Sequence, residues 1–263
     1  MTVFRHELRQ GKTAFAIWTA SIAFLLVICV FMFPEMKGEM DAVGEMFASM
    51  GSFTAAFGMD RLNFGTLIGF YAIECGNVLG LGGAFFASLI SVSVLSKEEK
   101  DRTAEFLLTH PISRTRVATG KLAAVLAQIT FMNLIILGLS SLSMGLIGED
   151  IPWKEVLLMH GAYYFLQLEL AGICFGISAF LRFGCIGIGM GLAAMMYFLN
   201  LIANMTERAK FLKYITPFGY CEGADIIANG NLDAGLITVG MLFACIGVTI
   251  AYWWYNRKDI RSA

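Results

Sequence analysis

Six long apolar stretches dominate the chain and constrain its fold more than any other feature. A helix needs about 20 predominantly apolar residues to cross the roughly 30 Å of hydrocarbon in a bilayer. The stretches lie at about 14–33, 64–95, 117–147, 155–181, 184–204 and 235–255, and each one is long enough. We therefore expect an all-α polytopic membrane protein with six transmembrane helices, in a single transmembrane domain that occupies residues 1–263.

The composition excludes several other classes of protein. Hydrophobic residues make up 57% of the chain and charged residues 15%, whereas soluble domains carry about 25% charged residues. The net charge is -1, which provides no basic field for nucleic acid. The six cysteines lie singly without a Cys-x-x-Cys pair, so they indicate no metal site.

The distribution of lysine and arginine predicts the orientation. Of these 19 residues, 13 lie in one set of segments. The set comprises the two termini, the region that connects spans two and three, and the loop that connects spans four and five. Cytoplasmic loops are rich in Lys and Arg, which places both termini in the cytoplasm and the chain in the plasma membrane. The polar stretch at about 205–234 then lies outside, and its apolar content predicts that it dips back into the membrane.

The largest charged break on the inner side is residues 96–114, named here the charged segment. It reads SKEEKDRTAEFLLTHPISR, with a polar beginning, an apolar patch at Phe106–Leu108, and Pro111, which ends a helix. The pattern predicts a docking helix, while a solvated loop remains the alternative. At the N-terminus, Phe4 and Leu8 share one helical face among charges, which predicts an interfacial helix, with a flexible basic tail as its alternative.

The charged segment resembles a known family. Glu99, Thr103, Glu105 and Leu107-Leu108, followed by Pro111–Arg114 and Gly120-Lys121, resemble the permease subunits of type-2 ABC transporters. The opening Phe4-x-x-Glu7-Leu8-Arg9 and the outer run 212–218 resemble the same permeases. One departure is Arg102, where these permeases usually carry Gly before the Thr.

The resemblance implies a function. In that family the loop between spans two and three is a coupling helix that fits a cytosolic ABC ATPase. Two permeases, of the same or a different kind, pair above two ATPases, which bind ATP and Mg. Here the coupling residues are expected to be Glu98, Glu99, Arg102, Glu105, Phe106 and Leu107. The chain is then expected to be an exporter subunit with no cofactor and no catalysis of its own.

Two acidic residues inside the spans leave a second function open. Glu74 and Glu169 lie well inside the second and fourth spans, where a charge costs at least about 3 kcal/mol. Either they form a polar site on a substrate or cation path, or they are protonated and hydrogen-bonded between helices. Their expected neighbours are His160, Gln167, Gln128, Asn77 and Asn133. The first interpretation supports an alternative function, a secondary transporter or ion pathway.

Two further motifs are weaker. Gly11-Lys12-Thr13 resembles the end of a phosphate-binding loop, but His6 stands where that loop requires Gly. Glycines four residues apart, including Gly172 and Gly176, predict close helix contacts, more often in the core of one subunit than at a dimer seam.

Overall fold

The computed structural model describes residues 2–38, 46, 50–100, 112–181 and 185–258. Within these ranges the chain forms helices joined by turns and loops, and no strand occurs among them. Six helical spans are long and apolar enough to cross a membrane. They are α1 (Thr2–Met36), α4 to α5 (Leu67–Val92), α8 (Arg114–Leu146), α9 (Trp153–Phe180), α10 (Ile186–Met205) and α12 (Ala234–Arg257). The six predicted spans are confirmed.

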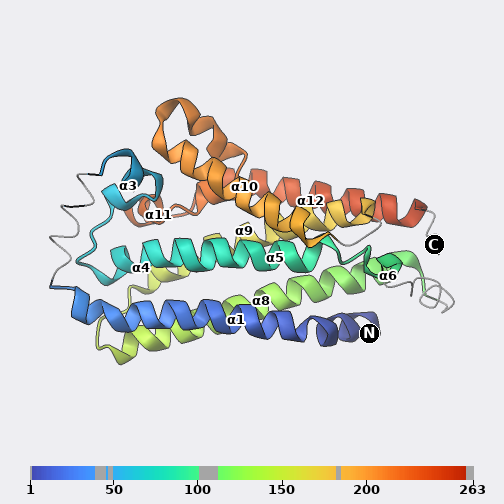
Figure 1. Ribbon diagram of the computed structural model, residues 1–263, viewed down its shortest axis with the longest axis horizontal. Helices are drawn as coiled ribbons and strands as arrows, with labels where there is room; N and C mark the ends of the chain where they lie inside the picture. The colour runs from blue at the N-terminus through green and yellow to red at the C-terminus, as the bar shows by residue number, and fades with distance from the viewer. Residues whose placement is uncertain (1, 39–45, 47–49, 101–111, 182–184, 259–263) are drawn as a thin grey trace.

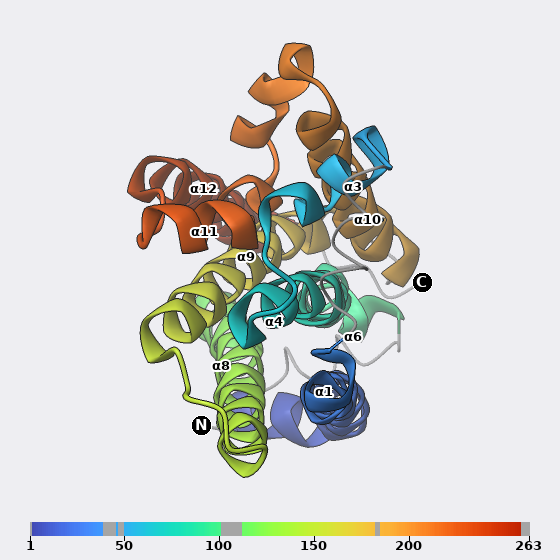
Figure 2. The same cartoon turned by 90° about the vertical axis from the view of Figure 1, so that its left-hand side faces the viewer.

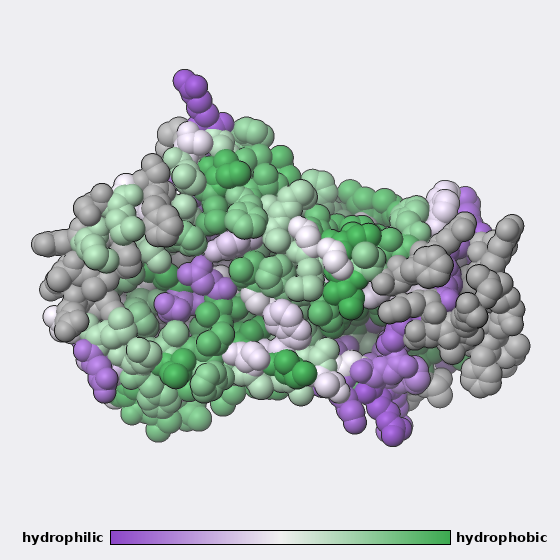
Figure 3. Space-filling model, viewed as in Figure 1, coloured by the Kyte–Doolittle hydropathy of each residue, from purple (hydrophilic) through white to green (hydrophobic). Residues whose placement is uncertain are grey.

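The long helices lie side by side along the long axis of the molecule (Figure 1). Both termini and α6 (Lys97–Lys100) lie at one end, named here the proximal end. The short helices α3 (Ser52–Ala56) and α11 (Gly223–Asn229) lie at the other, the distal end. Hydrophobic residues cover most of the face in Figure 3, while hydrophilic residues gather at the proximal end.

The fourth span is the centre of the bundle. Viewed end-on, α1 and α8 lie on one side and α10 and α12 on the other, with α9 and the second span between them (Figure 2). About 67% of the most apolar window of α9 is buried, against 17% for α12, so α9 is the core helix and α12 is peripheral.

Glycine lets α9 and α12 approach each other closely. A Cβ atom at Gly172 would lie 2.7 Å from the Cβ of Ala244, and one at Gly176 would lie 2.8 Å from the carbonyl oxygen of Gly247. This confirms the core-packing prediction for the first pair. Gly187 and Gly191 in α10 are another pair of glycines four residues apart. The core-packing prediction is wrong for them, because no atom of the described residues lies within 4 Å of a Cβ built on either one.

The second span contains a π-helical turn, η2 (Gly76–Leu81), between α4 (Leu67–Cys75) and α5 (Gly82–Val92). Gly76 and Gly80 face the side chain of Tyr163 in α9, which would lie 3.1 and 3.0 Å from a Cβ atom added to each glycine. Turns of this type are frequent at functional sites. The span thus loses helical regularity where it meets the core helix.

The first helix corrects one prediction. Residues 3–9 do not form a separate interfacial helix; they are the first turns of α1, which runs without a break to Met36. Gly11 lets the Gln128 side chain of α8 pack directly against this part of α1, because an added Cβ atom would lie 2.6 Å from that side chain. An ion pair from Glu7 to Lys121 of α8 also holds the segment against the bundle.

The distal stretch 206–230 folds back among the spans. It comprises η3 (Glu207–Tyr214), η4 (Pro217–Tyr220) and α11, and all four residues of η4 are buried. The Thr216 hydroxyl donates to the carbonyl oxygen of Met196, midway along α10, at 2.7 Å. The Tyr163 hydroxyl of α9 donates to the carbonyl oxygen of Cys221 at 3.0 Å. The later part of the stretch therefore packs against α9 and α10, and residues 206–230 are named here the re-entrant segment. Its dip into the membrane stays a prediction.

Candidate functional site

Buried charges gather at the proximal end between α1, α8 and the end of the second span. The Lys121 ammonium lies 3.0 Å from one Glu7 carboxylate oxygen and donates to the carbonyl oxygen of Val94 at 2.7 Å. The other Glu7 oxygen lies 3.7 Å from the Lys97 ammonium. The Lys121 side chain is fully buried and that of Glu7 is 7% exposed. Since a buried charge persists only when paired, this cluster fixes three spans in one arrangement.

A cavity of about 250 Å³ adjoins this cluster. Its lining includes Glu7, Lys97, Lys121 and Gln128, together with apolar residues of the second span. Gly11 completes the wall on α1. The proximal end therefore combines an open polar hollow with the ion pairs that hold it.

The charged segment begins with a short helix and then passes outside the described residues, so the predicted coupling helix stays a prediction. Lys97–Lys100 form the helix α6, and Ser113 caps α8 by accepting a hydrogen bond from the backbone of Arg116. Glu98 lies in α6, and its side chain is outside the described part. The other predicted coupling residues outside the described ranges are Arg102, Glu105, Phe106 and Leu107.

Glu99 is the one predicted coupling residue whose side chain the structure describes. Its carboxylate lies 2.8 Å from the ammonium of Lys258, just beyond α12, and both side chains are about nine-tenths buried. The Arg114 guanidinium donates to the carbonyl oxygen of Lys258 at 2.5 Å. Both ends of the charged segment are therefore attached to the end of α12.

The two acidic residues inside the spans have different partners. Glu169 is buried and accepts a hydrogen bond from the Tyr220 hydroxyl of the re-entrant segment at 2.9 Å. Glu74 is half-buried and accepts one from the Cys29 thiol of α1 at 3.5 Å. In the described part of the chain, no hydrogen bond or ion pair joins the two carboxylates, so each is tied to a different element.

The five expected neighbours bond elsewhere. The His160 ring is bonded to the Tyr71 hydroxyl at 2.8 Å. The Asn133 amide donates to Gln167 at 2.7 Å, and Asn77 accepts from the Tyr197 hydroxyl at 3.1 Å. Gln128 donates within its own helix. Apart from Gln128, these polar groups thus form separate pairs between helices, as polar side chains in membrane proteins commonly do.

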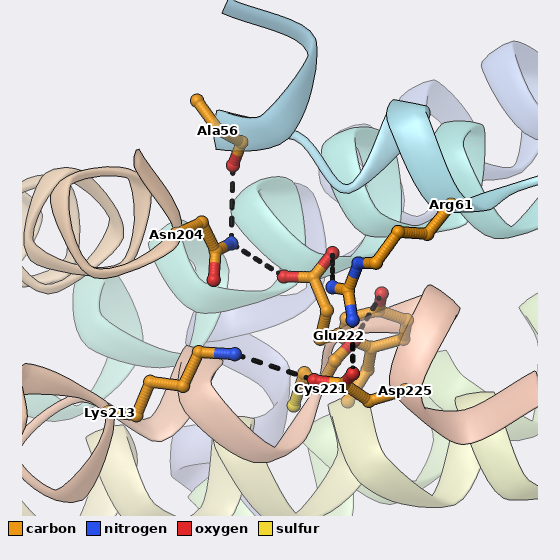
Figure 4. Close-up of polar contacts among 8 residues, drawn as sticks. Ala56, Arg61, Asn204, Lys213, Cys221, Glu222 and Asp225 are labelled. Carbon is orange, nitrogen blue, oxygen red and sulfur yellow. Dashed lines mark hydrogen bonds and ion pairs between the residues drawn. The ribbon is translucent and has the colours of Figure 1, made fainter. Parts of the chain in front are cut away.

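A second charged cluster lies at the distal end, around Glu222 (Figure 4). Glu222 accepts from the Asn204 amide at 2.7 Å, and that amide also donates to the carbonyl oxygen of Ala56 in α3. Arg61 lies 4.0 Å from Glu222 and is hydrogen-bonded to Asp225, which Lys213 approaches to 3.4 Å. The cluster ties α3 and η1 (Met59–Arg61) to the re-entrant segment.

The two carboxylates of this cluster have opposite pKa shifts. Burial raises the pKa of Glu222, although Asn204 and the two nearby cations oppose that shift. Burial would also raise the pKa of Asp225, but the Arg61 hydrogen bond and the Lys213 charge outweigh it, so this pKa is lowered. Glu222 is thus the group that favours protonation, while Asp225 favours its charged form.

A small pocket of about 50 Å³ lies beside Glu222, next to the π-helical turn. Asn77, Tyr197 and Asn200 line it, and the buried side-chain oxygen Oδ1 of Asn200 has no hydrogen-bond partner among the described residues. In the same described part, no three His, Cys, Asp or Glu side chains gather as metal ligands would.

Sequence reasoning missed most of these charges. Glu7 and Lys121 stood in the family pattern, but nothing in their spacing indicated that they pair. Glu222, Asp225 and Arg61 resembled ordinary charges of an outer loop. The available signal was the apolar run directly before Glu222, which marks a carboxylate carried into the bundle.

Comparison with known proteins identifies the chain's family. A family model described as ABC-2 family transporter protein matches residues 1–260. No curated protein matches the chain. The match covers nearly the whole sequence and confirms the resemblance to permease subunits of type-2 ABC transporters. The chain is therefore a multi-pass membrane protein of the ABC-2 transporter family.

Proposed function

We propose that this chain is the permease subunit of an ATP-driven ABC exporter. A separate cytosolic ATPase, present in two copies, binds ATP and Mg, and the proximal end faces the cytoplasm. The observation that carries the proposal is the attachment of the charged segment at both ends. Lys97 reaches Glu7 of α1, and Arg114 reaches the end of α12. A partner that displaces this segment therefore acts on several spans.

The proposed ATPase contact lies in the middle of the charged segment. Glu98, Arg102, Glu105, Phe106 and Leu107 are the proposed contact residues. Acidic side chains offer partners for Arg or Lys of the ATPase, and Phe106 supplies an apolar anchor of the kind that dominates interface energetics.

A pull-down of the full-length chain tests this contact. The tagged protein is purified from its own membranes, and an ABC-class ATPase with vanadate-sensitive ATP hydrolysis is expected to remain bound. Phe106→Asp should lose the ATPase, while Phe211→Asp should retain it, because Phe211 is an exposed phenylalanine in η3, outside the charged segment. Retention of the ATPase by Phe106→Asp would contradict the proposed contact.

A second permease, of the same or a different kind, is proposed to pack on α10. Support comes from Gly187 and Gly191, which have no described atom within 4 Å of an added Cβ atom, whereas Gly172 and Gly176 meet α12 within that distance. Cys185 is exposed at the start of this helix. Oxidation should link two copies of a homodimer through Cys185, and Gly191→Leu should reduce the linkage. Linkage that is insensitive to Gly191→Leu would place the seam elsewhere.

The direction of transport is proposed to be outward. Support comes from the Glu222 cluster, which ties η1 to the re-entrant segment at the distal end, as expected of an exporter that is closed on that side while it loads from the cytoplasm. Inside-out vesicles should accumulate substrate only with ATP. Uptake that follows an ion gradient, persists without the ATPase and stops in Glu74→Gln or Glu169→Gln would favour the ion-pathway alternative.

A further inference from the structure

The segment just after α12 is a junction for four parts of the chain. The Lys258 ammonium pairs with Glu99 of α6 at 2.8 Å and donates to the carbonyl oxygen of Leu181, at the end of α9, at 2.9 Å. From α8, Arg114 donates to the backbone of Lys258. One lysine therefore connects the beginning of the charged segment with the ends of two spans.

Neighbouring contacts hold the last turns of α12 in place. Thr119 and Tyr252 share a hydrogen bond between their hydroxyls at 2.8 Å, and Thr115 donates to the Asn256 side chain at 3.2 Å. Arg114 also lies 3.4 Å from the carbonyl oxygen of Tyr255, and a cation is favourable beside the carbonyl end of a helix. The end of α12 is thus fixed to α8 by several separate side chains.

The burial of the Glu99–Lys258 ion pair limits which partners the Glu99 carboxylate can have. Its side chain is 11% exposed and that of Lys258 is 10% exposed, so the carboxylate faces the chain's own lysine and not the solvent. An ion pair with both members withdrawn from water is difficult to open from one side, because the remaining charge would be stranded. Glu99 is therefore poorly placed to receive a cation from another protein.

The attached helices are suited to move together. Along α9 and α12, Gly172, Gly176 and Gly247 bring the two backbones into direct contact. Such close packing leaves little room for sliding, because interiors are dense and deform little. A displacement applied at Lys258 is then shared by both spans.

We propose that Lys258 is a positioning residue that fastens the charged segment to α12 and α9, and that Glu99 serves this attachment and not the ATPase contact. The proposal rests on the proposed function. Displacement of the segment by the ATPase passes through the Glu99–Lys258 pair to α12 and through Leu181 to α9. The N-terminal side of the segment reaches α1 separately, through Lys97 and Glu7.

The test measures docking and movement separately in the permease–ATPase complex. Spin labels on the exposed native thiols Cys185 and Cys245 report a distance between α10 and α12. ATP with vanadate should shift this distance in the wild type. Lys258→Met should keep the ATPase bound. The nucleotide-induced shift in conformer populations should be reduced by a factor of about 2 to 30 relative to the wild type.

Two further variants separate coupling from folding. The charge exchange Glu99→Lys with Lys258→Glu reverses the ion pair, but a glutamate cannot donate to the carbonyl oxygen of Leu181, so it should restore only the part of the shift that passes through the pair. Lys37→Met, which removes the lysine of the exposed pair with Glu149, should behave as the wild type. The label distance without nucleotide should be the same in all variants.

The outcomes distinguish the two claims. A wild-type chain that retains no ATPase would overturn both the proposed function and this inference. Normal docking with an undiminished shift in Lys258→Met would overturn the positioning role alone. If Glu99→Gln lost the ATPase while the complexes that still formed showed the full shift, Glu99 would be an ATPase contact residue, which would overturn its proposed role in the attachment.

Discussion

The two charged clusters of this chain differ in what they connect and how deeply they lie. At the proximal end, Glu7 and Lys121 join two full-length spans and are buried. At the distal end, Arg61 and Asp225 join two short helices, and their side chains are 44% and 40% exposed. Among the four charged residues described in the distal cluster, Glu222 alone is withdrawn from solvent to a similar degree.

This difference indicates different mechanical roles. Charges buried on both sides of a helix contact resist separation, because opening strands a charge in a medium of low dielectric constant. Exposed pairs exchange their partner for water at little cost. The proximal cluster is therefore suited to transmit movement, while the distal cluster is suited to open and close.

The strongest way to break the proximal cluster is to remove Lys121. Lys121→Met leaves the Glu7 carboxylate buried without its closest partner, and the free energy of unfolding should fall by about 3–5 kcal/mol. Unfolding in mixed detergent micelles measures this loss. Lys37→Met removes a lysine from an exposed pair and should cost about 1 kcal/mol or less.

A double variant shows whether the loss comes from the stranded charge. Glu7→Leu combined with Lys121→Met removes both charges, and it should recover most of the lost stability, since apolar replacement of a buried pair is often neutral. A double variant as unstable as Lys121→Met would mean that packing, not charge, determines the effect.

The buried contact between Glu169 and Tyr220 comes next. It fastens the re-entrant segment to the core helix, and Tyr220→Phe removes its donor while keeping the ring. We expect a loss of about 1–2 kcal/mol, measured by the same unfolding assay. The matched control is Tyr164→Phe, which breaks a hydroxyl pair with Thr130 and should cost about 0.6 kcal/mol. Equal losses would remove any special role for the carboxylate.

Sequence reasoning located the spans but not the pairs between them. Span length and apolarity are local properties, so the run at 155–181 already predicted α9 (Trp153–Phe180). The Glu7–Lys121 pair joins residues 114 positions apart, and only the packing of α1 on α8 brings them together. The same pair explains why α1 begins at Thr2, where charges among apolar residues had indicated a separate helix.

The different environments of the two distal carboxylates could not be predicted from the sequence for a related reason. A hydropathy average over many residues gives nearly the same value at Glu222 and Asp225, which lie three residues apart. It therefore could not distinguish the Glu222 side chain, which is 9% exposed, from that of Asp225, which is 40% exposed. Their environments depend on contacts with Asn204 and Arg61, which belong to other elements. The burial of this part of the segment was predictable, because it follows from the apolar residues around Pro217.

A smaller effect is expected when the exposed distal tie is cut. Arg61→Gln should lower the free energy of unfolding by about 1 kcal/mol or less. The local consequence should be easier to detect, because that energy corresponds to up to about a fivefold larger open population. Chymotryptic cleavage at Phe57, next to α3, measures it, with Lys37→Gln at a different ion pair as control. Unchanged cleavage would show that Asn204 alone holds α3.

The smallest effect should come from pH, because the two distal carboxylates oppose each other. The lowered pKa of Asp225 means that its contribution to stability is present above the unfolded pKa and is lost as pH falls through the folded pKa. The raised pKa of Glu222 means the reverse, so its contribution grows as pH falls. In the wild type the two partly cancel. Relative to the wild type, Asp225→Asn should therefore make the distal end lose less stability between neutral and acid pH. Glu222→Gln should make it lose more. Chymotryptic cleavage at Phe57, followed against pH, measures both changes. Parallel profiles for the two variants would show that these carboxylates do not control the closure of the distal end.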